Sequence, residues 1–403
     1  MAMRTHRFRH TLSAVVAVMA AVGLMASGAS PAAAGVPDPA SDPFYAQPAS
    51  FAGTHPGGVL NSRQVTITGL GIPLPYASYQ VQYVTENTVG VPQANVATII
   101  KPLHTTGPAK LVSYQPAIDS LSYLCDPSYL LRQGTEAEAV TIGNLLTKGW
   151  TVVEPDFLGP NHEWTAGVIE GKGTLDGIRA AENFAPVGLN GTATPVGMTG
   201  YSGGARGTEF AAELAPAYAP ELKIVGAAPG GVSGNIGNVA KGANGGAFAG
   251  IYFAAAMGIG RAYPEVGIDS LLNAKGKKME AAIGKMCIAQ FSATYAFQRI
   301  QTYTVNGVDP LTLPAIQKVI DQIKAGALGT PRVPLHIYMA SYDELVVTPD
   351  TDKLVQQYCA KGLTVQYVKY PLAEHVTALA EGFPVAVAWL SDRFAGRTAP
   401  STC

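Results

Sequence analysis

Short apolar runs that suit β-strands alternate along the chain with longer stretches that suit amphipathic helices. In residues 77–85, Tyr79, Val81 and Tyr83 fall on one face, as the two-residue period of a strand requires. Up to residue 230 the pattern predicts strands at 77–85, 96–100, 110–114, 150–153, 194–200 and 222–227, and helices at 135–146, 174–184 and 205–214. Alternating strands and helices are typical of βαβ units, so we expect an α/β core with a mostly parallel sheet.

Two of these helices carry local start signals. Thr135-Glu136-Ala137-Glu138 has the pattern of a capping box that would open the helix at 135–146. Thr174 is the expected N-cap of the helix at 174–184.

The alternation breaks off after residue 230, where a long segment of helical character follows. Its expected helices lie at 248–257, 271–286 and 291–300. The earlier pattern then resumes, with strands at 333–340 and 364–370 and helices at 350–360 and 376–394. We therefore expect a core of residues 63–230 and 332–403, interrupted by a helical cap insertion at 231–331.

The first 34 residues have the three parts of a secretory signal peptide. A basic start precedes a mostly apolar run at 12–26, and Ala32-Ala33-Ala34 supplies an A-x-A cleavage site. Because no Arg-Arg pair precedes the apolar run, we expect secretion by the Sec route, with cleavage near Ala34. Residues 35–62, rich in Pro, Ala and Gly, are expected to form a poorly structured lead-in.

Composition excludes several classes of protein. The 403-residue chain is 47% hydrophobic, too apolar for a disordered protein. Its 27 Lys and Arg residues against 28 Asp and Glu residues lack a basic excess, so we expect no nucleic-acid partner. The apolar run near 245–260 is too short and glycine-rich to span a bilayer, so we expect no membrane span.

Four cysteines, Cys125, Cys287, Cys359 and Cys403, lie in the part expected to be exported. They show no C-x-x-C spacing, which disfavours a zinc or redox site. An even number of cysteines in an exported chain predicts two disulfides, and the sequence leaves three pairings open.

Gly200-Tyr201-Ser202-Gly203-Gly204 is a G-x-S-x-G motif between an expected strand and an expected helix. This order is typical of a nucleophile elbow, in which small residues allow a strained turn that exposes the serine. An ordinary serine in a glycine-rich turn is the alternative. A phosphate-binding turn is disfavoured, because no lysine follows as in a Walker motif.

A nucleophilic serine needs a base, and in enzymes with this elbow the acid and then the histidine follow the serine. His336 and His375 are the histidines that follow Ser202. His336 falls inside an expected strand, whereas His375 lies in a loop just after one, so His375 is the expected base.

The acid should lie between the serine and the histidine, close to the end of a strand. Asp343 follows the expected strand at 333–340 by three residues and is the expected acid. Glu344 stays open as an alternative. Asp350 and Asp352 suit the first turn of the next helix, where the helix dipole favours acids.

A tetrahedral oxyanion needs two hydrogen-bond donors. The backbone N–H of Gly203, directly after the serine, is one, and the loop at 114–119 is placed to supply the other. No metal-ligand cluster or dinucleotide fingerprint is evident in the sequence, so we expect no metal and no cofactor.

With these residues in place, the chain resembles the secretory lipase family of the α/β-hydrolase superfamily over nearly its whole length after residue 34. The most specific segments are Gly200-Tyr201-Ser202-Gly203-Gly204-Ala205, Tyr218-Ala219-Pro220-Glu221-Leu222, Ser113-Tyr114-Gln115 leading to Asp119-Ser120 and Cys125, and Asp343-Glu344. The resemblance implies an α/β-hydrolase core with a helical cap at 231–331 over an acyl-binding tunnel. It implies these residue roles: Ser202 as nucleophile, Asp343 as acid, His375 as base, Asp119 and Gly203 as oxyanion hole, and disulfides Cys125–Cys287 and Cys359–Cys403.

We therefore expect a secreted serine ester hydrolase, a triacylglycerol lipase or carboxylesterase that acts through an acyl-enzyme. We expect a monomer that binds lipid or other carboxylic esters and makes transient contact with a lipid interface. A short-chain, polyester or feruloyl-type esterase, or an acyltransferase, would use the same triad and stays open. A non-catalytic secreted binding protein is a further alternative, against which the intact Ser202, Asp343 and His375 argue.

Overall fold

The centre of the molecule is a large mixed sheet. The computed structural model describes residues 35–69, 71–105 and 107–403, so the expected signal peptide lies outside the described residues. In this part of the chain the sheet has nine strands. Their order is β1 (Val59–Val65), β4 (Ser78–Glu86), β5 (Pro92–Ile100), β7 (Thr151–Pro155), β6 (Leu111–Gln115), β8 (Val196–Tyr201), β9 (Ile224–Gly230), β10 (Leu335–Ala340) and β11 (Val365–Tyr370). A separate small sheet pairs β2 (Thr68–Gly69) with β3 (Ile72–Pro73).

The strand directions divide the large sheet into two parts. The first four strands in this order pair antiparallel. From β7 to β11 every neighbouring pair is parallel. The mostly parallel sheet confirms the expected α/β fold class.

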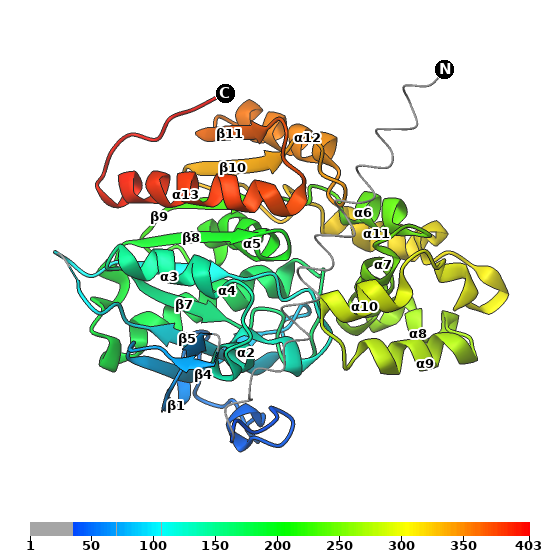
Figure 1. Ribbon diagram of the computed structural model, residues 1–403, viewed down its shortest axis with the longest axis horizontal. Coiled ribbons are helices and arrows are strands. Elements are labelled where there is room, and N and C mark those ends of the chain that lie inside the picture. Colours follow the sequence, from blue (N-terminus) through cyan, green and yellow to red (C-terminus); the bar gives the residue numbers. More distant parts are fainter. Residues whose placement is uncertain (1–34, 70, 106) are drawn as a thin grey trace.

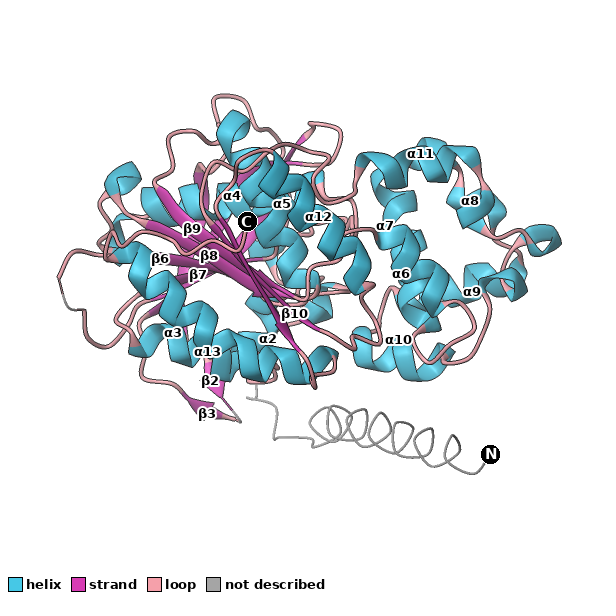
Figure 2. Ribbon diagram, turned by 90° about the horizontal axis from the view of Figure 1, so that it is seen from above, coloured by secondary structure: helices cyan, strands magenta, loops and turns pink. Residues whose placement is uncertain are grey.

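Helices cover both faces of the sheet (Figures 1 and 2). On one face lie α4 (Val168–Asn183), α5 (Gly203–Tyr218) and α12 (Thr348–Ala360), and on the other lie α3 (Ala139–Thr147) and α13 (His375–Phe394). Successive residues of a strand point to opposite faces of the sheet. Val153 and Ile337 pack in the core under α4, α5 and α12, whereas Val152 and Tyr338 pack in the core under α3 and α13. The sheet strands are therefore apolar on both sides, as buried parallel strands must be.

The segment between β9 and β10 forms a helical lobe beside the sheet (Figure 2). Its helices are α6 (Ile236–Ala243), α7 (Ala249–Ala262), α8 (Ile268–Leu271), α9 (Ala274–Ile283), α10 (Ile288–Tyr295) and α11 (Pro314–Gln322). They share an apolar core, with Phe253 fully buried, that also takes in Phe157 and Trp164 of the sheet domain. No helix in the described ranges is long and apolar enough to cross a membrane.

The expected capping box at Thr135 is wrong. The helix α3 begins at Ala139, and Glu138, the residue before it, makes no side-chain capping hydrogen bond. The carboxylate of Glu138 instead accepts hydrogen bonds from the Tyr114 hydroxyl and the backbone N–H of Ala117. The Glu138 carboxylate, which a capping box would use within the helix, therefore binds residues far away in the sequence.

The expected start of the next helix is also wrong. The helix α4 begins at Val168, and Thr174 lies inside it, where its hydroxyl donates to the carbonyl oxygen of Glu170. Methyl groups on Gly171 and Gly173 would lie 2.8 Å from neighbouring backbone atoms. The first turns of α4 therefore need glycine for close packing, and glycine weakens the helical pattern in the sequence.

Other boundaries move less. The strand β1 begins at Val59, within the expected lead-in, because it pairs with β4 along the edge of the sheet. The helix expected at 291–300 spans Ile288–Tyr295. The short helices α2 (Pro127–Gln133), α6 and α11 were not expected.

Candidate active site

The serine motif forms a sharp turn at the carboxyl end of β8. Ser202 has φ 55° and ψ −116°, and α5 begins at the next residue, Gly203. A methyl group on Gly200 would lie 2.5 Å from the carbonyl oxygen of Gln115, and one on Gly204 would lie 1.8 Å from it. The turn packs so closely against the end of β6 that both outer positions must be glycine. This packing holds Ser202 in a conformation that residues other than glycine rarely adopt.

His375 and Asp343 extend a hydrogen-bonded series from this serine. Nε2 of His375, the first residue of α13, lies 2.8 Å from Ser202 Oγ, and its Nδ1 lies 2.8 Å from Asp343 Oδ2. The other oxygen of Asp343 accepts hydrogen bonds from the backbone N–H groups of Leu345 and Val346. These bonds keep the carboxylate turned toward the imidazole. With Nδ1–H donating to Asp343, Nε2 can accept the serine proton.

Glu344, the alternative acid, binds the backbone of the histidine. Its Oε2 accepts a hydrogen bond from the His375 N–H, 2.9 Å away. The structure thus places Asp343 against the imidazole and Glu344 at the start of α13. His336 is fully buried in β10, with Nδ1 2.9 Å from Gln366 Oε1. It is not part of the series.

Two effects oppose each other at the His375 imidazole. Burial lowers its pKa, whereas the hydrogen bond and the charge of Asp343 raise it, helped by the charges of Glu344 and Asp119. The net result is a pKa above the ordinary value for histidine. The neighbouring carboxylates therefore stabilise the imidazolium that would form when the serine loses its proton.

Asp119 faces the serine turn from the loop after β6. Its backbone has φ 38°, and a methyl group on Gly203 would lie 1.9 Å from its Oδ1. Burial, together with the charge of Glu170, raises the pKa of Asp119 to about 6. The carboxyl therefore lies against the backbone of the residue after the serine, and it is easier to protonate than an exposed aspartic acid.

Glu138 anchors this loop and was not identified as a site residue from the sequence. One of its oxygens accepts from Ala117 N–H at 2.8 Å, and the other accepts from the Tyr114 hydroxyl. Burial and the charge of Glu136 raise the pKa of Glu138 to about 7. Its signal in the sequence was the Thr135-to-Glu138 motif, which we assigned to a helix cap.

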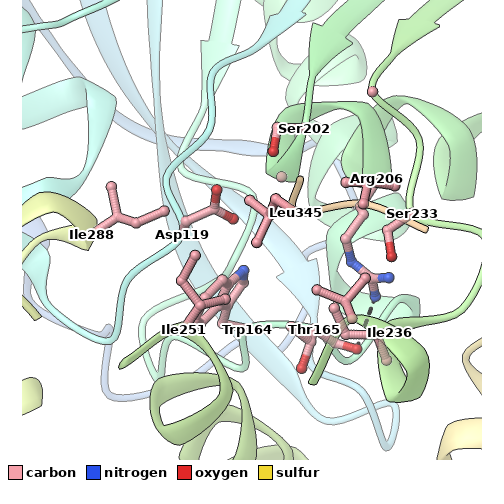
Figure 3. A pocket seen from close by; sticks show the side chains of 14 residues that line it. Asp119, Trp164, Thr165, Ser202, Arg206, Ser233, Ile236, Ile251, Ile288 and Leu345 are labelled. Carbon is pink, nitrogen blue, oxygen red and sulfur yellow. Dashed lines mark hydrogen bonds between the residues drawn. The ribbon is translucent and has the colours of Figure 1, made fainter. Parts of the chain in front are cut away.

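A cavity opens next to Ser202 between the sheet domain and the helical lobe (Figure 3). It has about 410 Å³ of space between the atoms, a figure that includes the part open to solvent. Its apolar walls come from Ile236, Val239, Ile251, Ile288, Leu345 and Val346. A second, apolar cavity inside the lobe shares Thr165 and Ile236 with the first. The two cavities therefore adjoin.

The four cysteines form two disulfides, in the pairing that the resemblance implies. Cys125 pairs with Cys287, which joins the sheet domain to the helical lobe, and Cys359 pairs with Cys403. Among the residues that the structure describes, no group of three or more His, Cys, Asp or Glu side chains could hold a metal ion.

The mostly parallel sheet, covered by helices on both faces, and the serine turn after β8 define an α/β-hydrolase. A sequence model of the secretory lipase family matches residues 126–402, and the chain belongs to that family. This confirms the resemblance drawn from the sequence.

Proteins similar to this chain include enzymes and one named as inactive. A probable inactive lipase of Mycobacterium tuberculosis is 36% identical over 89% of this chain and 83% of that protein. Lipase A of Arthroderma benhamiae is 35% identical over 91% of this chain and 81% of that protein. The X-ray structure of Candida antarctica lipase A in its closed state matches with a TM-score of 0.84, at 34% identity over 91% of this chain and 89% of that one. The family and these relatives support a hydrolase of the lipase or esterase type.

The packing of the serine turn predicts a strong effect of a single methyl group. Gly204→Ala would place it 1.8 Å from the Gln115 carbonyl oxygen, so the backbone must shift. We expect the free energy of unfolding to fall by about 3 kcal/mol or more. Urea unfolding followed by circular dichroism measures this change.

Gly242→Ala in α6 is the matched control, because no described atom beyond the adjacent residues and the backbone of its own helix lies within 4 Å of the added methyl group. Alanine favours a helix over glycine by about 1 kcal/mol, so this variant should be at least as stable as the native chain. Equal stability of the two variants would contradict the packing described for the turn.

Proposed function

We propose that this protein hydrolyses carboxylic esters, acylglycerols among them, through an acyl-enzyme on Ser202. The observation that carries the proposal is the hydrogen-bonded series Ser202–His375–Asp343, which ends on a cavity with apolar walls. A serine with an oriented base behind it can attack a carbonyl carbon, and the cavity can bury the acyl chain of an ester.

In this mechanism His375 transfers one proton in each of the two half-reactions. Ser202 Oγ attacks the ester carbonyl carbon while Nε2 of His375 takes the hydroxyl proton. Asp343 stabilises the imidazolium, which then gives the proton to the leaving alcohol. A water molecule gives a proton to the same imidazole as it attacks the acyl-enzyme. The imidazolium returns this proton to Ser202 Oγ as the bond between Oγ and the acyl group breaks and the acid is released.

Two groups are placed to stabilise the oxyanion. The backbone N–H of Gly203, the first residue of α5, lies at a helix N-terminus and would donate to the developing negative charge. The Asp119 carboxyl is the second donor and must carry a proton to donate. Its raised pKa supports this role, and substrate that excludes water from the site raises the pKa further.

The helical lobe has the role of a cap over the acyl chain in this proposal. An acyl chain would extend from Ser202 through the first cavity, past Ile236 and Ile251, into the second, past Ile259 and Leu311. Each buried methylene contributes about 0.8 kcal/mol, or roughly fourfold in binding. The length of this path therefore decides the preferred acyl chain.

Contact with a lipid interface and secretion belong to the same proposal. Tyr342, Leu372 and Val376 are apolar and exposed directly beside Asp343 and His375. They would let the mouth of the site rest on an aggregated ester. Two disulfides suit an oxidising compartment, in keeping with export by the signal peptide expected at residues 1–34.

A non-catalytic binding protein is the second candidate, and the relative named as a probable inactive lipase favours it. The two candidates differ in whether Ser202 reacts. A fluorophosphonate probe labels a serine that has an oriented base, and a binding protein would leave it unreacted.

Replacing the serine tests the proposed function directly. We expect the protein to hydrolyse p-nitrophenyl esters, and Ser202→Ala to lower kcat by at least about 10⁴-fold, because no other group can carry the acyl chain. Ser62→Ala, at an exposed position of the edge strand β1, is the control and should keep full activity. Equal rates in the native protein and Ser202→Ala, or no fluorophosphonate adduct on Ser202, would overturn the proposal.

A series of p-nitrophenyl esters from acetate to palmitate, run on the same proteins, separates the kinds of ester hydrolase. A maximum at medium or long chains indicates a lipase that uses both cavities. A maximum at acetate or butyrate indicates a short-chain esterase that uses the first.

The proposed role of Asp119 predicts a change in pH dependence. Asp119 loses its proton, and with it the donated hydrogen bond, as the pH rises through its pKa of about 6 in the free enzyme. His375 must be neutral to act as base, and its pKa is raised above the ordinary value for histidine, so it lies above the pKa of Asp119. The form with neutral His375 and protonated Asp119 is then a minor species of the free enzyme, with its largest population between the two pKa values. The profile of kcat/KM should therefore be bell-shaped.

Asp119→Asn has an amide donor that does not titrate, so its kcat/KM should no longer fall on the alkaline side. Asp119→Ala lacks the donor and should lose about 10²- to 10³-fold in kcat across the range. An alkaline fall that is the same in Asp119→Asn and the native protein would show that Asp119 is not the donor.

A further inference from the structure

A buried guanidinium lies in the cavity beside Ser202, away from the oxyanion donors. Arg206 extends from the first turns of α5, and in Figure 3 its guanidinium lies near Thr165, Ser233 and Ile236. Arg206 is 4% exposed and Ser233 6% exposed, and both line the cavity. A charged group is therefore built into a pocket whose walls are otherwise mostly apolar.

The guanidinium uses part of its hydrogen-bonding capacity. Nη2 donates to the carbonyl oxygen of Thr165 at 2.9 Å and lies 3.2 Å from Glu170 Oε2. Within the described ranges, no hydrogen-bond partner is found for Nε or Nη1 of Arg206, or for the hydroxyl of Ser233. Leaving a buried donor without a partner is unfavourable, so a ligand that meets these groups would bind favourably.

The hydrogen bonds of Arg206 and Glu170 also hold Thr165, which lies where the two cavities adjoin. Thr165 has φ 70°, a conformation that β-branched residues rarely adopt. Its carbonyl oxygen accepts from Arg206, and its N–H donates to Glu170 Oε1 at 2.8 Å. Thr165 lines both cavities and Arg206 lines the first, so a chain that passes along Thr165 from one cavity to the other would lie close to Arg206.

We propose that Arg206 and Ser233 form a subsite for an uncharged oxygen carried by the acyl chain of the substrate, a hydroxyl or oxo group a few bonds from the scissile carbonyl. The inference rests on the proposed ester hydrolysis and names the substrate class within it. An oxo oxygen would accept from Arg206 Nε–H or Nη1–H, and the Ser233 hydroxyl can either donate or accept. A plain alkyl chain would cover these donors without bonding to them.

The charges around the subsite favour an uncharged oxygen over a carboxylate. Glu170 already pairs with Arg206, so the charge of the guanidinium is already balanced. An acyl chain with a carboxylate would add another negative charge among these groups in a site with little water, which raises the cost of burial. A hydroxyl or oxo group gains the hydrogen bond without that cost.

Two isosteric acyl chains test the inference. The p-nitrophenyl esters of 5-oxohexanoate and 5-methylhexanoate have the same number of heavy atoms and differ in an oxo oxygen against a methyl group. The 4-oxopentanoate and 4-methylpentanoate pair probes the position one carbon closer. The rate with Ser202→Ala is subtracted as background. We expect the native protein to prefer an oxo ester in at least one pair, by about tenfold in kcat/KM.

Variants of the subsite then show which side chains bind the oxo oxygen. Ser233→Ala should lower the oxo-to-methyl ratio several-fold, and Arg206→Met combined with Glu170→Gln should bring the ratio close to one. The double variant avoids leaving Glu170 charged and unpaired. Ser292→Ala is the matched control, because Ser292 is a buried serine of α10 that likewise has no hydrogen-bond partner in the described ranges but does not line the cavity. It should leave the ratio unchanged.

The ratio separates a role in specificity from a role in folding, since a damaged fold lowers both rates together. If the double variant does not fold, the oxo-to-methyl ratio of Ser233→Ala tests the subsite by itself. A native ratio at or below one for both pairs, or a ratio that Ser233→Ala and the double variant leave unchanged, would overturn the subsite. A higher rate for the p-nitrophenyl half-ester of glutaric acid than for either oxo ester would overturn its preference for an uncharged oxygen. No hydrolysis of any ester would instead overturn the proposed function.

Discussion

The carbonyl oxygen of Gln115 lies so close to the turn at Ser202 that a methyl group on either Gly200 or Gly204 would overlap it. This contact joins the ends of two neighbouring parallel strands, β6 and β8. The loop after β6 carries Asp119, and the turn after β8 carries the serine. Their close approach therefore places the carboxyl of Asp119 against Gly203, and the geometry of the site depends on it.

The site is held by hydrogen bonds to the backbone as much as by contacts between side chains. Two N–H groups orient Asp343, and the His375 N–H is bound by Glu344. The Ala117 N–H is bound by Glu138, which steadies the loop of Asp119. Each of these carboxylates is fixed by backbone at the ends of the sheet strands, so the side chains around Ser202 are already ordered.

Much of this site could be predicted from the sequence, because its signals are local. The G-x-S-x-G motif needs a strand before it and a helix after it, and both were visible as apolar patterns around Ser202. Asp343 and His375 follow from their chain order and from the strands that precede them. Asp119 was implied by family resemblance, because nothing in its neighbourhood marks its carboxyl as facing Gly203.

The rest depends on contacts between distant segments. The sequence pattern did not predict the start of α4. Gly171 and Gly173 are required there by close packing against other backbone, and two glycines weaken the helical pattern of apolar residues. Glu138 resembled a helix cap, but its partners lie more than 20 residues earlier in the chain. That Nε and Nη1 of Arg206 have no partner among the described residues could not be predicted either, because this depends on how Thr165 and Glu170 contact its guanidinium in the folded chain.

The most direct test of the account is a crystal structure of the protein after reaction with an alkylphosphonate ester. We expect phosphorus bonded to Ser202 Oγ, the phosphoryl oxygen within hydrogen-bonding distance of the Gly203 N–H and the Asp119 carboxyl, and the alkyl chain in the cavity lined by Ile236 and Ile251. An adduct on another residue, or a phosphoryl oxygen turned away from both Gly203 and Asp119, would contradict it.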